Sequence, residues 1–141
     1  MPVRKANAQW QGDLKSGKGD MALESGAYEG QFSYRTRFED GTGTNPEELV
    51  GAAHAGCFSM QFSAMLAADG HTPDSIKTEA RVHFAIDDTP TIERIELICR
   101  GKVPGMDEET FKQTADKAKE ACPVSRLFKG AEIELDATLD D

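Results

Sequence analysis

The chain has 141 residues, of which 38% are hydrophobic and 29% charged, a composition typical of one globular domain rather than a disordered segment. Its 25 acidic residues exceed its 16 basic ones and give a net charge of −9, which repels phosphate backbones and anionic lipid headgroups. We therefore expect a single domain over residues 1–141 that binds neither nucleic acid nor a membrane surface.

The N-terminal sequence, MPVRKANAQWQG, has two basic residues but no apolar segment, so we expect no signal peptide. No apolar run approaches the ~20 residues of a membrane span. These features predict a cytoplasmic protein, in which thiols stay reduced. The three cysteines, Cys57, Cys99 and Cys122, are too few for a disulfide framework and are either core residues or reactive thiols.

The first third of the chain has the pattern of short strands separated by glycine-containing turns. We expect strands over residues 8–14, 20–24 and 30–38, the first of them around Trp10. Gly17 and Gly26 are among the glycines that supply the intervening turns.

A long helix is predicted over residues 46–69. Asn45 suits the N-cap, Pro46 suits the first helical position, and Glu48 completes the pattern of a capping box. Gly70 is positioned to end the helix. From Leu49 to Ala68 its polar side chains are His54, Ser59, Gln61 and Ser63. A helix that is apolar nearly all round is buried on most of its circumference, so we expect wrapping by sheet and by a second subunit.

Residues 76–86, IKTEARVHFAI, alternate between apolar and polar side chains, which predicts a strand with one buried face. Residues 91–100 are its expected hairpin partner. A second helix is predicted over 107–120, with a buried stripe made of Phe111, Ala115, Ala118 and Cys122. A helical turn after Pro123 and a strand over 131–139 complete the chain. The expected class is α+β: a β-rich N-terminal part, a long buried central helix, a β-hairpin, a second helix and a closing strand.

Cys57 lies near the middle of the predicted long helix, and two interpretations stay open for it. Free cysteine is among the most buried residue types, so a core thiol is the simpler one. The helix N-terminus is too distant along the helix to lower the pKa of this thiol. A reactive Cys57 therefore needs a cation that the tertiary structure brings to it.

Cys122 directly precedes Pro123, a residue that can start a new helical turn. That position brings a sulfur close to free backbone N–H groups, with Arg126 nearby in sequence, and so favours a thiolate. The alternative is a core residue at the end of the second helix. Cys99 shares the apolar face of its strand and is predicted to be a core residue.

Three segments together resemble one protein family. They are GTNPEELVGAAHAGCFSM around Cys57, the upstream TRFE with Arg37, and the downstream AKEACPVS with Cys122. These segments, within a similarity that runs the length of the chain, closely resemble the OsmC branch of the OsmC/Ohr family of hydroperoxide reductases. The two cysteines are 65 residues apart, and each stands in a distinctive local sequence.

The resemblance implies a thiol peroxidase whose fold is unrelated to that of thioredoxin-type peroxiredoxins. Cys57 matches the peroxidatic cysteine and Cys122 the resolving cysteine. Arg37 matches the arginine that activates the first thiol, and Glu47 matches the acid that holds this arginine. The resemblance also implies an intertwined homodimer with two active sites at the subunit interface and no metal or organic cofactor.

General thiol chemistry agrees with these roles. A thiol of ordinary pKa is only ~5–10% ionised near pH 7.5, and a contacting cation lowers that pKa by ~1–3 units. The gain in thiolate is about tenfold, too little for a peroxidase, so the guanidinium must also stabilise the oxygen that leaves as the O–O bond breaks. Attack leaves Cys57 as a sulfenic acid and Cys122 condenses with it to a disulfide. A dithiol reductant, lipoyl-type in the family, then restores both thiols.

Helix geometry bears on the dimer. Glu47 and Cys57 are ten residues apart on one helix, roughly 15 Å along its axis. An arginine held by Glu47 therefore reaches Cys57 of the same chain only with difficulty. If two such helices cross in antiparallel fashion, Glu47 of one approaches Cys57 of the other, so we predict that Arg37 and Glu47 serve the partner's thiol.

Five apolar side chains lie where they can line an approach to the sulfur: Phe38, Phe58, Met60, Phe62 and Met65. We expect at least three of the five to be ordinary core residues and take Phe38, Phe58 and Met60 as candidates for a substrate pocket. An apolar pocket favours alkyl or lipid hydroperoxides over hydrogen peroxide, which gains nothing from apolar contact.

His54 lies one helical turn before Cys57, and a Cys–His pair is a known activation device. No third group orients the imidazole, so a packed or interface histidine is the favoured interpretation. A metal site built from His54, His71, His83 and the cysteines lacks ligand spacing, so we expect no metal.

The predicted function is that of a cytoplasmic, homodimeric reductase of organic hydroperoxides that acts in oxidative or osmotic stress defence. Two alternatives stay open: an enzyme that prefers hydrogen peroxide or another oxidant, and a non-catalytic, stress-binding dimer whose two thiols sense oxidation. Steady turnover with a dithiol separates enzyme from sensor, since a sensor oxidises once and stops.

Overall fold

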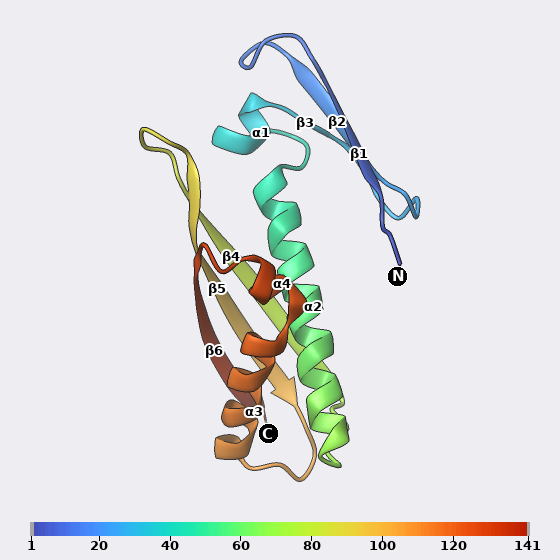
Figure 1. Cartoon of the computed structure of the whole chain (residues 1–141), viewed down its shortest axis with the longest axis vertical. Helices are drawn as coiled ribbons and strands as arrows, with labels where there is room; N and C mark the ends of the chain where they lie inside the picture. Colours follow the sequence, from blue (N-terminus) through green and yellow to red (C-terminus); the bar gives the residue numbers. More distant parts are fainter. Residues whose placement is uncertain (1, 141) are drawn as a thin grey trace. The chain divides into compact units, whose positions relative to one another are not determined.

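The structure is a computed structural model that describes residues 2–140. It contains two compact units, one up to Leu49 and the other from Val50 onward, each with its own three-stranded sheet. The element order is three strands, a short and a long helix, two strands, two helices and a last strand (Figure 1). This order confirms the predicted α+β class.

The N-terminal unit contains an antiparallel sheet of β1 (Ala6–Gln11), β2 (Lys18–Leu23) and β3 (Glu29–Phe32), with β2 in the centre. The first two strands begin two residues earlier than predicted. β3 is followed by a short helix, α1 (Tyr34–Phe38), in a segment where a continuous strand over 30–38 was predicted.

Local hydrogen bonds explain why α1 is a helix and not the end of a strand. Ser33 is its N-cap, and Ser33 Oγ accepts a hydrogen bond from the Thr36 N–H at 3.2 Å. In return Thr36 Oγ1 accepts one from the Ser33 N–H at 2.8 Å, which completes a capping box. The prediction of a strand up to residue 38 was wrong here because this capping pair starts a helix among aromatic residues that favour a strand.

Gly19 on the central strand β2 brings two aromatic rings together. It pairs with Trp10 on β1 and with Phe32 on β3, and the two rings lie 5.4 Å apart between centroids. A Cβ at Gly19 would lie 2.6 Å from the Phe32 ring and 2.7 Å from the Trp10 ring. Only glycine therefore lets both rings pack over this strand.

The long helix α2 (Pro46–Ala68) is confirmed at both of its predicted ends. Asn45 caps its start, since the side-chain Oδ1 accepts a hydrogen bond from the Glu48 N–H at 2.7 Å. The Glu48 carboxylate accepts a hydrogen bond from the Thr44 hydroxyl at 2.9 Å. In the capping box that we expected, the donor to this carboxylate would be the Asn45 N–H. Gly70, with φ of 86°, ends the helix in the left-handed conformation that glycine favours.

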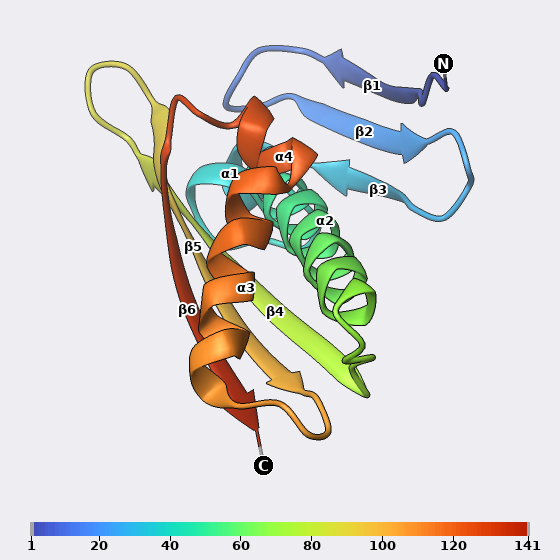
Figure 2. The same cartoon turned by 60° about the horizontal axis from the view of Figure 1, so that its bottom comes forward.

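In the C-terminal unit, β4 (Ser75–Ala85) and β5 (Thr91–Lys102) form the predicted antiparallel hairpin. β6 (Glu132–Asp140) adds to β5 in parallel. α3 (Glu108–Ala121) lies over the same face of this sheet as α2 (Figure 2). The short helix α4 (Pro123–Leu127) follows α3 directly.

The covered face of this sheet and its two helices form the core of the C-terminal unit. Every residue of the predicted α3 stripe is fully buried, namely Phe111, Ala115, Ala118 and Cys122. From α2, the side chains of Phe58, Phe62 and Leu66 are fully buried, and the Phe62 ring lies 4.9 Å from that of Phe111. Cys99 on β5 is buried in the same core, as predicted.

By length and composition, α2 is apolar enough to cross a membrane, although we expected no such run in the sequence. The difference arises because alanine and glycine fill the positions between its few polar side chains. Phe58, Phe62 and Leu66 of α2 are completely buried in this unit, and a core helix of a soluble protein passes the same test.

Replacing Gly101 on β5 with alanine should destabilise this core. The new Cβ would lie 2.5 Å from the Phe111 ring and 3.1 Å from Ile76 Cδ1. The Phe111 ring is fully buried against Phe62, so we expect the free energy of unfolding to fall by about 1–3 kcal/mol. Denaturant unfolding measures this change. Gly130→Ala is the control, since its Cβ would meet no atom within 4 Å, and equal stability of the two variants would contradict the prediction.

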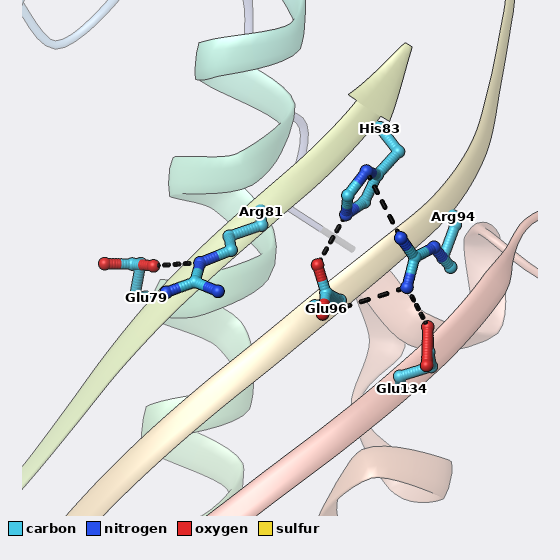
Figure 3. Close-up of polar contacts among 6 residues, drawn as sticks. All are labelled: Glu79, Arg81, His83, Arg94, Glu96 and Glu134. Carbon is cyan, nitrogen blue, oxygen red and sulfur yellow. Dashed lines mark hydrogen bonds and ion pairs between the residues drawn. The ribbon is translucent and has the colours of Figure 1, made fainter. Parts of the chain in front are cut away.

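The other face of this sheet is charged (Figure 3). His83 on β4 contacts the Glu96 carboxylate on β5, and Arg94 on β5 binds Glu134 on β6 at 2.6 Å. The hydrogen bond from His83, with help from the charge of Arg94, lowers the pKa of Glu96. These pairs link all three strands. The alternation over residues 76–86 therefore places apolar side chains on the packed face of the sheet and charged side chains on the solvated face.

Candidate active site

The two cysteines predicted to react with each other meet between α2 and α4. Cys57 lies near the middle of α2 and is half-buried, whereas Cys122 lies at the junction of α3 and α4 and is fully buried. The Cys57 thiol interacts with the Cys122 thiol, and neither forms a disulfide in the structure. The fold thus brings together two sulfurs that are 65 residues apart in the sequence.

The surroundings of Cys57 within the C-terminal unit favour the protonated thiol. Burial raises the pKa of Cys57, the hydrogen bond with Cys122 raises it further, and a hydrogen bond from the backbone N–H of Val124 lowers it. Val124 belongs to the first turn of α4. The amide that we expected beside the Cys122 sulfur therefore acts on Cys57 instead, and a Cys57 thiolate requires a cation beyond these groups.

Cys99 does not share the environment of the other two cysteines. Burial raises the pKa of Cys99 to about 11, and a hydrogen bond with Thr78 only partly offsets this effect. The thiol is therefore protonated near neutral pH and serves as a small core side chain.

His54 points toward α4. Its Nε2 shares a hydrogen bond of 2.7 Å with Ser125 Oγ, and the edge of its ring meets the ring of Phe128 at 5.6 Å between centroids. The ring is fully buried, and burial lowers the pKa of His54. This is the packed histidine that we favoured, although its serine partner was not predicted. Within the described part of the chain, no group of three or more His, Cys, Asp or Glu side chains is arranged to hold a metal ion.

Arg37 and Glu47 form an ion pair in the N-terminal unit. Arg37 lies in the last turn of α1 and Glu47 in the first turn of α2. Nε and Nη2 of Arg37 both donate to the Glu47 carboxylate, at 3.1 and 2.9 Å. The Asn45 side chain donates to the Thr36 carbonyl at 2.9 Å and so fixes α1 at the start of α2. A bidentate ion pair of this kind orients the guanidinium as well as binding it.

An apolar hollow of about 230 Å³ adjoins Arg37 in the same unit. Its apolar wall is formed by Trp10, Leu14, Phe32, Tyr34 and Phe38. A guanidinium in the wall of an apolar hollow suits a molecule with an apolar body and a polar end. The sequence reasoning missed Trp10 and Phe32 as pocket residues. Gly19, which both rings flank, is the signal that could have placed them together.

The three residues predicted to form a substrate pocket lie in different surroundings. Phe38 lines the hollow, Phe58 is 0% exposed, and Met60 is 77% exposed on α2. Phe58 packs against Phe62 at 5.6 Å and has no surface left for a substrate, so its assignment to the pocket was wrong. Phe58 and Phe62 are core residues and Met65 is partly buried against the same core, so two of the five candidates are fully buried where at least three core residues were expected.

One face of α2 is apolar and exposed in the single chain, whereas we expected sheet and a second subunit to bury the helix on most of its circumference. It consists of Ala53, Gly56, Met60, Ala64 and Ala67. These positions recur at the helical spacing of three or four residues and therefore form one stripe. An apolar stripe of this kind is typical of a surface that another protein covers.

Known proteins resemble this chain along most of its length. The family model described as OsmC-like protein matches residues 39–136. The chain is 49% identical over 138 residues to peroxiredoxin OsmC of Escherichia coli (strain K12), a match that covers 96% of each protein. It is 35% identical over 100 residues to the organic hydroperoxide resistance protein of Xanthomonas axonopodis pv. citri (strain 306), covering 70% of this chain and 67% of that protein.

The fold also resembles that of solved structures. The crystal structure of an OsmC-like protein from Mycoplasma pneumoniae matches with a TM-score of 0.78 and covers 99% of each chain. The sequence identity of this pair is 14%, so the match shows a shared fold alone.

Proposed function

We propose that this chain, which belongs to the OsmC family, is a cysteine-dependent peroxidase that reduces organic hydroperoxides to alcohols. The observation that carries the proposal is the contact between the Cys57 and Cys122 thiols, since one thiol can be oxidised there and the other can trap it. The names of two relatives support a peroxide substrate: one is a peroxiredoxin, and the other is named for resistance to organic hydroperoxides.

Cys57 is the proposed nucleophile because it is the less buried of the two sulfurs. Its thiolate attacks one oxygen of the hydroperoxide, the O–O bond breaks, and the other oxygen leaves as an alkoxide that takes up a proton to become the alcohol. Cys57 is thereby oxidised to a sulfenic acid. Cys122 then attacks the sulfenic sulfur, the S–O bond breaks, water leaves, and a disulfide forms. A dithiol reductant exchanges with this disulfide, restores both thiols and is itself oxidised to a disulfide.

Arg37 is the proposed activator of Cys57. Burial raises the pKa of that thiol, and a nearby guanidinium opposes this effect by favouring the thiolate. The guanidinium also stabilises the negative charge on the departing alkoxide. Glu47 holds the guanidinium through two hydrogen bonds and so orients it for both tasks.

The active form is proposed to be a homodimer in which α2 of one subunit faces α2 of the other. The exposed apolar stripe that contains Gly56 and Met60 supports this arrangement, because removing apolar surface from water is favourable. In this arrangement Arg37 and Glu47 act on the partner's Cys57. Glu47 and Cys57 of one chain are ten residues apart on α2, roughly 15 Å along its axis, so an arginine held by Glu47 reaches Cys57 of its own chain only with difficulty. A dithiol cycle of this kind also fits the reducing cytoplasm, the proposed location.

The proposed substrates are alkyl or lipid hydroperoxides. The apolar hollow beside Arg37 supports this choice, since an alkyl group gains free energy by entering it and hydrogen peroxide has no such group.

Turnover with a dithiol should be steady, and kcat/KM for cumene hydroperoxide should exceed that for hydrogen peroxide by about tenfold or more. The measurement follows peroxide loss over many equivalents per subunit, with dihydrolipoamide as the reductant. Consumption that stops after about one equivalent per subunit would identify a redox sensor instead. Equal kcat/KM for the two peroxides would overturn the substrate preference while leaving the peroxidase intact.

A further inference from the structure

The buried hydrogen bond between His54 and Ser125 has no part in the proposed chemistry. His54 is 0% exposed and Ser125 5% exposed, and their side chains meet at 2.7 Å. The other ring nitrogen, Nδ1 of His54, is buried without a hydrogen-bond partner among the described residues. A polar ring that leaves one nitrogen unsatisfied destabilises a core relative to an apolar side chain, so this histidine needs an explanation other than packing.

The protonation state of His54 follows from its surroundings. Burial lowers its pKa, so the imidazole is neutral and carries a single N–H. An unpaired buried N–H is rarer than an unpaired acceptor. We therefore assign the proton to Nε2, which in this tautomer donates to Ser125 Oγ and leaves the lone pair on Nδ1.

The hydrogen bond between His54 and Ser125 lies three residues from a cysteine on each of its two sides. His54 lies three residues before Cys57 on α2, and Ser125 lies three residues after Cys122 on α4. Residues three apart share a helix face, so the hydrogen bond and the thiol contact lie side by side, one helical turn apart. Both join α2 to α4. The ring of Phe128, just after α4, packs against the His54 ring in a T-shaped arrangement, with 5.6 Å between the ring centroids.

Helix α4 needs such an attachment. It has five residues, and a helix this short does not hold its position without tertiary contacts. Cys122 is the residue that caps its start, so any movement of α4 moves the Cys122 sulfur. Disulfide formation is sensitive to such movement, because it requires a sulfur–sulfur distance of ~2.05 Å and a narrow range of dihedral angles.

We propose that His54 is a positioning residue for the second step of the cycle, an inference that rests on the proposed function. Through Ser125 it holds α4 on α2, so that Cys122 faces the sulfenic sulfur of Cys57 as soon as that acid forms. Cys122 then attacks, its proton leaves with the sulfenic hydroxyl as water, and the disulfide closes before a second peroxide oxidises Cys57 to the sulfinic acid.

Two variants remove the hydrogen bond from opposite ends. His54→Phe keeps a ring of similar size for the contact with Phe128, and Ser125→Ala removes only the hydroxyl oxygen. Each variant and the double variant are mixed with cumene hydroperoxide and quenched at intervals. Mass spectrometry then counts reduced, sulfenic, disulfide and sulfinic forms. Ser59→Ala is the matched control, since it removes a hydrogen bond of the same length, 2.7 Å, that joins α2 to β4 at Thr78.

Both single variants should close the disulfide about 3- to 10-fold more slowly, the loss expected from one buried hydrogen bond. The rate of sulfenic acid formation serves as the internal reference, and the sulfinic fraction should rise in proportion as closure slows. The double variant should close no more slowly than the slower single variant, because both remove the same contact. Ser125→Thr, which keeps a hydroxyl, should restore most of the closure rate, and Ser59→Ala should match the wild type.

Two results would overturn the proposal, and they differ from failure of the proposed function. Closure at the wild-type rate in Ser125→Ala would show that the hydrogen bond does not position Cys122. Additive slowing in the double variant would show two independent packing defects instead of one contact. If wild-type protein forms neither a sulfenic acid nor the Cys57–Cys122 disulfide, the proposed function itself fails and the positioning role with it.

Discussion

Replacing Cys57 with serine should abolish turnover of organic hydroperoxides, with a loss of at least about a thousandfold in kcat/KM. A serine hydroxyl stays protonated where a thiol can ionise, and it does not attack the O–O bond. Replacing Cys122 with serine should give a different defect. This variant should consume about one equivalent of peroxide per subunit and then stop, because the sulfenic acid on Cys57 has no thiol to condense with.

The difference between these two variants is measured by peroxide loss during the first turnover and by trapping of the sulfenic acid with dimedone. An added small thiol should rescue Cys122→Ser but not Cys57→Ser, since only the former still forms a sulfenic acid. Cys99→Ala is the matched control. Burial raises the pKa of Cys99 to about 11, so this thiol is protonated near neutral pH and its loss should leave the kinetics unchanged. If one equivalent of peroxide gives no more dimedone-trapped sulfenic acid in Cys122→Ser than in the wild type, the resolving role would be contradicted.

The long elements of the fold could be predicted from the sequence because their signals are local. The ends of α2 follow from Asn45 and Gly70, which act through hydrogen bonds and backbone conformation within a few residues. The hairpin follows from the alternation over 76–86, which one buried face imposes. The short helix α1 was missed because its capping pair lies inside a run of aromatic residues that favours a strand.

The candidate site could be predicted only in part, for a different reason. Cys57, Cys122, Arg37 and Glu47 stand in distinctive local sequences, so residue types and resemblance identified them. The contacts that tune them join residues far apart in the chain. Val124 donates to the sulfur of Cys57 and His54 binds Ser125, which is 71 positions away. The residue pattern of one segment cannot predict such pairs, because they depend on how α4 packs on α2.

Replacing Arg37 with lysine should lower kcat/KM for organic hydroperoxides by about 10- to 100-fold, although the positive charge is kept. Lysine presents a point charge and cannot bind Glu47 through two parallel donors, so its ammonium is not held in one orientation. Arg37→Gln should be more severe and should also raise the pKa of Cys57, since no cation then opposes the effect of burial. Thiolate absorbance near 240 nm against pH measures this shift. An unchanged rate for Arg37→Lys would show that a point charge suffices.

A mixture of two inactive variants decides whether Arg37 acts within its own chain or on the partner. Arg37→Gln and Cys57→Ser chains are unfolded together and refolded as mixed dimers. If Arg37 serves the partner's Cys57, each mixed dimer contains one intact site, and random pairing restores about a quarter of wild-type activity. If Arg37 serves its own chain, no site in the mixture has both residues and activity stays absent. Recovery therefore requires a site built from two subunits, and its absence would contradict the inference from the ten-residue spacing on α2.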